Sequence, residues 1–347
     1  RAFGADPLLV ARHGEAAVLG LHDAGVAACV KHFPGHGATR EDSHLALPVV
    51  DVALDVLRAR ELVPFRAAIA AGVRCVMTAH IRIPALTGDL PATLSAAAAR
   101  SLLRDELGFD GVLITDALEM RGASARAGVP AAAAAAIAAG ADLLCLGPAQ
   151  GPDVVAATVA AAAEAVRDGR IPRDRLDEAL ARVAALRQAS NGRPAVAVSA
   201  VDSSAGMRAA RAALRLRGAV PTLRRPVVVQ LRPPAGIAAG PVPWGIAPWL
   251  SDHGGDVIDV DETGPAPAQL LAQAADRSLV VVVRDAHRYP WTVSVIERLV
   301  ADRPDTVVVE MGLPVWQPGH AGPYIATHGA ARVNAAAAAE VLARHPG

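Results

Sequence analysis

Residues 31–44 read KHFPGHGATREDSH and hold three histidines, one lysine and two acidic residues. So many titratable groups would be costly to bury without a role, because each charged group loses its hydration. Asp42 and His44 lie two positions apart, so the carboxylate can orient the imidazole and stabilise its charged form. Lys31 and His32 come before them, at the end of an apolar run. The segment therefore predicts a catalytic or binding loop.

Two chemistries fit this loop. The first is a zinc site, for which the donor residues would be His32, His36, Asp42 and His44. The second is acid–base catalysis by His44 with Asp42, in which Lys31 and His32 bind the substrate. Residue types alone leave both alternatives open.

Asp116 is a second candidate, outside the loop. It ends the apolar run GVLITD and is followed by ALEM. An acidic residue that ends a parallel strand faces the carboxyl edge of the sheet, where active sites gather. The structural alternative is that Asp116 caps a following helix.

The elements that must position these residues alternate between strand and helix. Continuous apolar runs, which are typical of parallel strands covered on both faces, predict strands over residues 25–33, 72–81, 111–116 and 141–147. Helices are predicted over 52–71, 95–107 and 130–139, with Ser95 as an N-cap and Gly72, Gly108 and Gly140 at helix C-termini. This alternation indicates an α/β fold with a parallel sheet. The strand spacing approaches the roughly 31 residues per unit of a (β/α)8 barrel. Four strands do not close a barrel, so the chain is predicted to be either an open sheet or the second half of a barrel.

A second α/β region follows a polar connection. Its predicted strands lie at residues 225–232, 256–261, 278–285, 305–312 and 324–329, with helices between them. This pattern predicts a small doubly wound domain. The region contains neither GxGxxG nor a P-loop, so no nucleotide site is predicted there.

The composition limits the number of domains and the classes of function that fit the chain. The chain has 347 residues, 52% of them hydrophobic, and a formal net charge of zero. About two domains are expected, and a general nucleic-acid or membrane-surface binder is disfavoured because it would carry a basic excess. Three widely spaced cysteines in apolar surroundings predict buried free thiols. The alanine-rich run at 129–140 is too short to span a bilayer. The chain begins RAFGADP, without methionine or leader, and neither a cytoplasmic nor an envelope location is favoured.

The motifs KHFPGHG, DSH and ITDALEM, with RAFGADP upstream, resemble the bacterial β-N-acetylglucosaminidases of glycoside hydrolase family 3. The resemblance runs from Arg1 to about Gln188 in the same order and spacing. The combination of PGHG and DSH distinguishes this branch from the β-glucosidases and β-xylosidases of the family. The resemblance implies that the four predicted strands are strands five to eight of a (β/α)8 TIM-type barrel, with the first four absent from this chain. The expected domains are a partial barrel over 1–188, a linker with a connecting helix over 189–221, and a C-terminal α/β sandwich domain over 222–347.

The resemblance also implies roles for single residues. Asp116 corresponds to the catalytic nucleophile, and His44, paired with Asp42, to the acid/base. Positions that correspond to substrate-binding residues are Arg1, Lys31 and His32, with His36 shaping or lining the site and His80 at its mouth. No metal and no cofactor are expected, because a histidine that carries a proton cannot serve as a metal ligand.

The implied reaction is retaining, exo-acting hydrolysis of terminal β-linked N-acetylglucosamine from cell-wall or chitin-type oligosaccharides. Phosphorolysis is an alternative, since a neutral imidazole repels an attacking phosphate less than a carboxylate would. A non-catalytic sugar-binding remnant is the other alternative, because half of the barrel is missing. The expected partner is thus a small carbohydrate, with no nucleic acid and no membrane span; the oligomeric state is not predicted.

Overall fold

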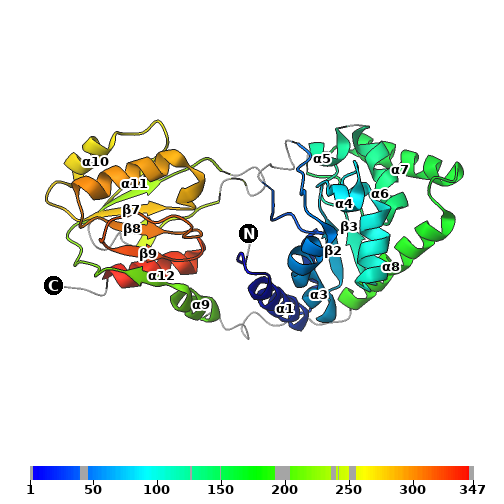
Figure 1. Cartoon of the computed structure of the whole chain (residues 1–347), viewed down its shortest axis with the longest axis horizontal. Coiled ribbons are helices and arrows are strands. Elements are labelled where there is room, and N and C mark those ends of the chain that lie inside the picture. Colours follow the sequence, from blue (N-terminus) through cyan, green and yellow to red (C-terminus); the bar gives the residue numbers. More distant parts are fainter. Residues whose placement is uncertain are drawn as a thin grey trace. The chain divides into compact units, whose positions relative to one another are not determined.

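The computed structural model describes residues 3–39, 46–125, 127–148, 150–191, 204–235, 240, 242–249 and 255–343. The chain divides into two compact units, Arg1–Ser199 and Ala200–Gly347, which are coloured blue to green and green to red in Figure 1. The finer boundaries expected at 188 and 221 stay a prediction. Among the residues described, no helix is both long enough and apolar enough to cross a membrane.

The first unit contains a three-stranded parallel sheet in the order β1-β2-β3. The strands are β1 (Cys29–Phe33), β2 (Cys75–Thr78) and β3 (Val112–Ile114). The helical segments are α1 (Pro7–Asp23), α2 (Leu54–Val56), η1 (Leu57–Glu61), α3 (Val63–Ala70), α4 (Pro84–Thr87), η2 (Ala92–Leu94), η3 (Ala97–Glu106), α5 (Arg121–Ser124), α6 (Gly128–Ala139), α7 (Pro152–Arg167) and α8 (Arg173–Asn191). The predicted parallel α/β arrangement is confirmed.

The fourth predicted strand is reduced to one bridging pair of residues. Residues 141–147 form no named strand, and Leu143 makes a single parallel bridge to Ile114 of β3. Two features explain this. Gly140 and Gly147 have positive φ angles at the two ends of the run, and Asp142 turns inward to bind arginines.

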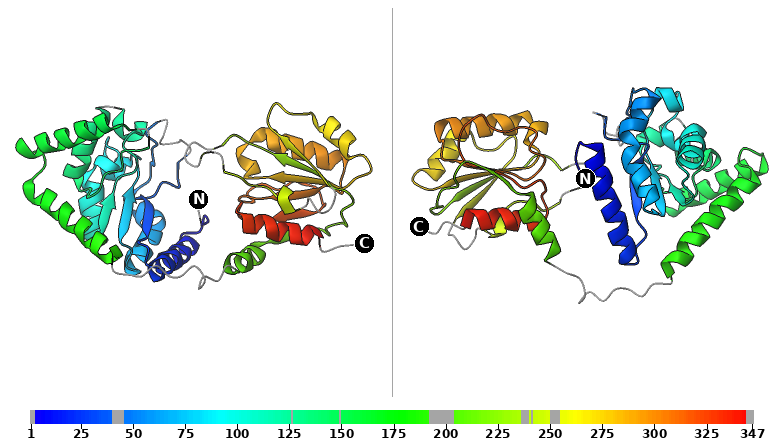
Figure 2. Two further views of the ribbon diagram at one scale, coloured as in Figure 1. Left: turned by 180° about the vertical axis from the view of Figure 1, so that it is seen from behind. Right: turned by 60° about the horizontal axis from the view of Figure 1, so that its bottom comes forward.

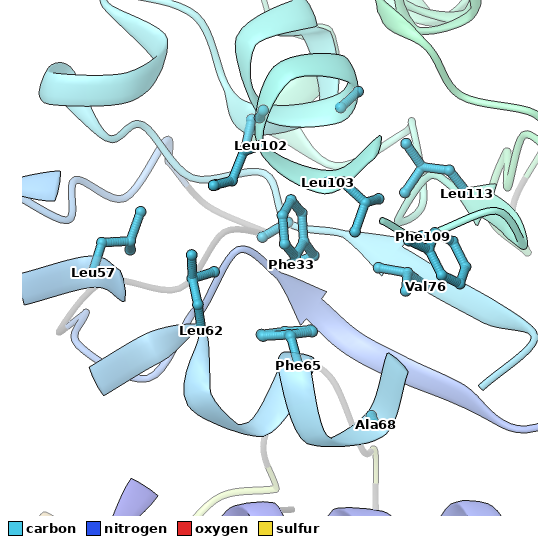
Figure 3. Close-up of a cluster of buried hydrophobic side chains, with 14 of the residues drawn as sticks. Phe33, Leu57, Leu62, Phe65, Ala68, Val76, Leu102, Leu103, Phe109 and Leu113 are labelled. Atoms are coloured by element: carbon cyan, nitrogen blue, oxygen red, sulfur yellow. The ribbon is translucent and has the colours of Figure 1, made fainter. Parts of the chain in front are cut away.

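The core of the first unit forms around Phe33, the last residue of β1. Its ring meets the ring of Phe65 on α3 edge-on, with centroids 5.2 Å apart. Figure 3 shows the side chains that close over this pair, all of them buried: Leu57, Leu62, Leu102, Leu103 and Phe109. Because Phe33 is anchored in this way, the loop that follows β1 starts from a fixed point.

The helix C-termini follow the sequence prediction, and the predicted N-cap residue follows it in its backbone. Gly72, Gly108 and Gly140 have positive φ angles at the ends of α3, η3 and α6, the conformation in which glycine commonly ends a helix. The predicted N-cap role of Ser95 is supported by its backbone, which is extended (φ −109°, ψ 116°) directly before Ala96, where the helical residues begin. Ser95 is buried, and only its backbone carbonyl accepts hydrogen bonds from the helix.

Asp142 joins three segments of the first unit. Its side chain is fully buried and accepts hydrogen bonds from the guanidinium groups of Arg104 (2.7 Å), Arg175 and Arg182 (3.4 Å). The Leu113 N–H of β3 donates to the same carboxylate at 2.9 Å. The carboxylate therefore connects η3 and α8 to the start of β3.

We expect Asp142→Ala to lower the free energy of unfolding of the first unit by about 3–5 kcal/mol, because it leaves buried guanidinium groups without their shared carboxylate. The control is Asp177→Ala on α8, which removes an exposed ion pair to Arg173 and should cost less than about 1 kcal/mol. Denaturant unfolding followed by far-UV circular dichroism measures both. Similar losses in the two variants would contradict the role given to Asp142.

The second unit contains a six-stranded sheet in the order β4-β9-β8-β7-β5-β6. The strands are β4 (Arg215–Arg217), β5 (Val227–Leu231), β6 (Asp256–Val260), β7 (Leu279–Val283), β8 (Val307–Glu310) and β9 (Tyr324–Ala326). Strands β5 to β9 run parallel, and β4 pairs antiparallel with β9. All five predicted strands are present. The sequence gives no sign of β4, a short basic segment at the sheet edge.

Helices cover both faces of this sheet. The α-helices in the described part of this unit are α9 (Ala205–Ala213), α10 (Pro267–Ala274), α11 (Pro290–Asp302) and α12 (Arg332–Ala343), and the short helical segments are η5 (Ala247–Trp249) and η7 (Ala286–Arg288). Alternate residues along β5, β7 and β8 enter two separate cores, one with α10 and α11 and the other with α12. Figures 1 and 2 show α11 and α12 on opposite sides of the strands. This explains why the strands read as continuous valine runs rather than as alternating patterns.

Glu310, the last residue of β8, is 1% exposed, and its carboxylate accepts three backbone hydrogen bonds. The donors are the N–H groups of Asp285 (2.8 Å), Ala286 (3.1 Å) and Gly312 (2.6 Å). These bonds tie the loop after β7 to the loop after β8. Burial raises the pKa of Glu310 to about 7, although the three N–H groups favour the charged form.

We expect the free energy of unfolding of the second unit to fall as the pH rises through about 7. The pKa of Glu310 is higher in the folded chain than its ordinary value, so its contribution is complete below that ordinary value and is lost above about 7. The loss is up to about 3 kcal/mol. Tryptophan fluorescence in denaturant reports this unit alone, since all four tryptophans lie within residues 200–347. Glu310→Gln should flatten the pH dependence; an unchanged slope would contradict the assignment.

Candidate active site

The parallel sheet of the first unit brings two of the predicted site residues together. His32 lies on β1, and Asp116 comes two residues after β3; both strands flank β2 and end at the same edge of the sheet. His32 Nε2 is 3.5 Å from Asp116 Oδ2, and the two side chains are only 17% and 19% exposed. A protonated His32 would therefore hold the Asp116 carboxylate in place by charge as well as by contact.

The backbone around Asp116 leaves one carboxylate oxygen directed toward His32. Asp116 Oδ1 accepts the Ala117 N–H at 2.8 Å, and Oδ2 is the oxygen nearer His32. The helix-cap alternative is wrong, because α5 begins only at Arg121 and its N-cap is Met120. Asp116 thus lies on the segment that leaves the strand rather than at a helix N-terminus.

His36 is held by the loop that carries it. Its ring lies edge-on to that of His32, with centroids 6.0 Å apart. The Thr39 hydroxyl donates to the His36 carbonyl at 3.1 Å, so its oxygen is free to accept from His36 Nδ1 at 3.0 Å. Gly35 has a φ of +132°, and a Cβ there would lie 2.7 Å from the Cβ of Glu61. These contacts fit the expectation that His36 shapes the loop, which stays a prediction.

His80 lies beneath the site rather than at its mouth. It is fully buried, Nε2 donates to the Ala117 carbonyl at 3.0 Å, and Nδ1 is 2.8 Å from the Thr93 hydroxyl. Thr93 in turn contacts Thr78 Oγ1 at 2.8 Å. Both ring nitrogens are therefore occupied within the protein. The substrate-binding role expected of His80 stays a prediction, and the contact that the structure shows supports the backbone next to Asp116.

The remaining predicted residues divide into described and undescribed ones. Lys31 is described and exposed on β1. Three lie outside the described residues: Arg1, Asp42 and His44. The acid–base pair and the zinc alternative both depend on these positions and stay predictions. In the described part of the chain, no three histidine, cysteine, aspartate or glutamate side chains gather as a metal site would require.

The cysteine prediction is partly wrong. Cys75 is buried, but Cys29 on β1 is exposed and Cys145 is intermediate. Cys29 lies on the edge strand β1, where exposed positions alternate with partly covered ones from Cys29 to His32.

The Glycosyl hydrolase family 3 N terminal domain matches residues 1–186. The chain belongs to glycoside hydrolase family 3. A family 3 structure, the β-N-acetylglucosaminidase from Paenibacillus sp. str. FPU-7, has a TM-score of 0.85 and 35% identity, covering 99% of this chain and 70% of that one.

Curated relatives carry the name beta-hexosaminidase. The protein from Stenotrophomonas maltophilia (strain K279a) is 45% identical over 144 residues, which is 42% of this chain and 43% of that protein. The protein from Thiobacillus denitrificans is 42% identical over 158 residues, covering 45% of this chain and 44% of its own length. The chain thus matches less than half the length of these relatives.

Sequence reasoning missed the residues that support the site. Thr93 and Thr78 position His80, yet a threonine within an ordinary α/β segment carries no signal of such a role. The contact between His32 and Asp116 was implied only by the shared sheet edge. Parallel strand ends were the signal that could have paired them.

Proposed function

We propose that the protein to which this chain belongs hydrolyses terminal β-linked N-acetylglucosamine with retention of configuration. The observation that carries the proposal is the position of Asp116 after β3, with Oδ2 next to His32. Similarity to proteins named beta-hexosaminidase supports the substrate class. We further propose that β1 to β3 and the Leu143 bridge belong to the second half of a (β/α)8 barrel, followed by the α/β domain.

In the first step, Asp116 Oδ2 attacks the anomeric carbon while the bond to the leaving oxygen breaks. His44, as imidazolium, gives its proton to that oxygen, and Asp42 stabilises the charged imidazole. In the second step, neutral His44 removes a proton from water, whose oxygen attacks the anomeric carbon and releases Asp116. Two displacements on one carbon retain its configuration.

Other residues bind or position. His32, next to Asp116, and the exposed Lys31 are proposed to bind the sugar hydroxyl groups, together with Arg1. His80 is proposed to fix Asp116 through the Ala117 carbonyl. His36 is proposed to hold the shape of the loop that follows β1.

We expect His80→Gln to lower kcat by about tenfold with little change in KM, because it loosens the nucleophile rather than removing a sugar contact. The control is Thr93→Ser, which keeps the hydroxyl that faces Nδ1 and should stay near wild type. A rise in KM with unchanged kcat would instead return His80 to a substrate-binding role.

The test of the proposed function is turnover of aryl glycosides by the complete protein that carries this chain. We expect hydrolysis of an aryl β-N-acetylglucosaminide and little of the matching β-glucoside. The 347-residue chain by itself should show no turnover, because β1 leaves an open edge in the described sheet. Added phosphate that yields a sugar 1-phosphate would establish phosphorolysis instead, and inactivity of the complete protein would refute the proposal.

A further inference from the structure

A cavity of about 310 Å³ lies near the start of β3, the end of the strand opposite Asp116. Its volume is at the lower end of the range of small-molecule pockets. Four arginines line it, two from η3 and two from α8: Arg100, Arg104, Arg175 and Arg182. Neither the candidate active site nor any step proposed above uses this cavity.

The enclosed part of the cavity has more positive than negative charge. Arg104, Arg175 and Arg182 all share the carboxylate of Asp142, whose two oxygens are already occupied. The other two acids at the cavity, Asp105 and Glu178, are exposed to solvent, Glu178 by 55%. Their charge is therefore screened by water, whereas the guanidinium groups of Arg104 and Arg175 are mostly enclosed.

Two details indicate that the arginines are incompletely satisfied. Arg175 is 3% exposed, yet its Nε has no hydrogen-bond partner within the described part of the chain. Arg100 is exposed and donates a long hydrogen bond, 3.4 Å, to the Ala138 carbonyl. In addition, burial lowers the pKa of Arg104 to about 10, and the neighbouring Arg182 and Arg175 act in the same direction, despite Asp142.

We propose that this cavity binds a phosphate-type oxyanion, either free or as the phosphate group of a small molecule. Guanidinium groups present paired N–H donors that match such oxygens, and a dianion offsets more of the enclosed charge than a carboxylate does. Since the arginines come from both η3 and α8, the anion would join two of the three segments that Asp142 joins.

Isothermal titration of the complete protein that carries this chain, in a chloride buffer, tests the proposal, with inorganic phosphate, sulfate and a hexose phosphate as probes. Arg182→Gln should weaken phosphate binding by about tenfold, because it removes one charged donor from the cavity. Arg187→Gln, an exposed arginine on the same helix, is the matched control and should bind as the wild type does.

Glu178→Gln gives the opposite change. It removes the exposed carboxylate that Arg175 contacts at 2.7 Å and Arg182 at 3.6 Å, so it should tighten phosphate binding several-fold. A cluster that serves only structure would lose stability in this variant and would gain no affinity. Circular dichroism verifies that each variant is folded before titration.

Tighter binding of the hexose phosphate than of phosphate would indicate an organic ligand, and equal binding would indicate the free anion. Both outcomes support the site. No binding of any probe, or equal binding by wild type and Arg182→Gln, would overturn it. The assay needs no turnover, so its result is independent of the proposed hydrolysis.

Discussion

Asp116→Ala in the complete protein is expected to lower turnover by on the order of 10⁵-fold on every β-N-acetylglucosaminide, whatever the leaving group. The reason is that the first displacement needs the Asp116 oxygen as its nucleophile, and no described neighbour can replace it. His32, whose Nε2 lies 3.5 Å from Asp116 Oδ2, has the proposed role of binding and orienting the sugar. Steady-state rates on an activated aryl glycoside and on a natural disaccharide measure the effect.

Azide provides the matched rescue. In Asp116→Ala, a small external anion can occupy the space of the missing carboxylate and attack the anomeric carbon, which should give the α-glycosyl azide. The control variant is Asp110→Ala, an exposed aspartate before β3, which should retain wild-type activity. If Asp116→Ala kept more than about one-hundredth of the wild-type rate, Asp116 would not be the nucleophile.

His44→Ala in the complete protein should lose roughly 10²–10⁴-fold in activity on a natural disaccharide, whose leaving oxygen needs a proton. On an activated aryl glycoside the leaving group departs without that proton, so the glycosyl-enzyme still forms. Rapid-mixing experiments should then show a burst of the aryl alcohol followed by slow turnover. Asp42→Ala should behave as a milder His44→Ala, because it removes only orientation and charge stabilisation.

The comparison between the two substrates decides the role of His44. Equal losses of burst and turnover on activated and natural substrates would show that His44 is not the acid/base. Recovery of His44→Ala by added zinc, or loss of wild-type activity on chelation, would instead favour the metal alternative for this loop.

The sequence predicted those parts of the fold in which local signals and tertiary packing agree. Strands β5, β7 and β8 each contain at least three consecutive valines, and their burial on both faces is what such runs favour. The strand predicted over 141–147 failed because a buried charge outweighed an apolar pattern. Asp142 binds three arginines from distant segments, and no window of sequence around it contains those partners.

Some residues of the candidate site could also be predicted from local sequence, and others could not. Asp116 could be predicted because the end of a parallel strand is a position defined by the chain itself. The support that His80 gives to the backbone next to Asp116 could not be predicted. It depends on hydrogen bonds to Thr93 and Ala117, which come from other segments. For Asp42 and His44 the motif remains the basis of the assignment, because both lie outside the described residues.

The three backbone N–H groups that bind Glu310 belong to loops at the carboxyl ends of β7 and β8. In open parallel sheets, loops at this edge often present such groups to anionic ligands. Here the side chain of Glu310, at the end of β8, occupies these N–H groups. Because it is part of the same chain, its effective concentration at them is high. An anion from solution would have to compete for these N–H groups with a carboxylate that is covalently part of the chain. For an anion to bind at this edge of the second unit, Glu310 would first have to be replaced by a residue without a carboxylate. The second unit would have to stay folded without the three hydrogen bonds that this carboxylate accepts.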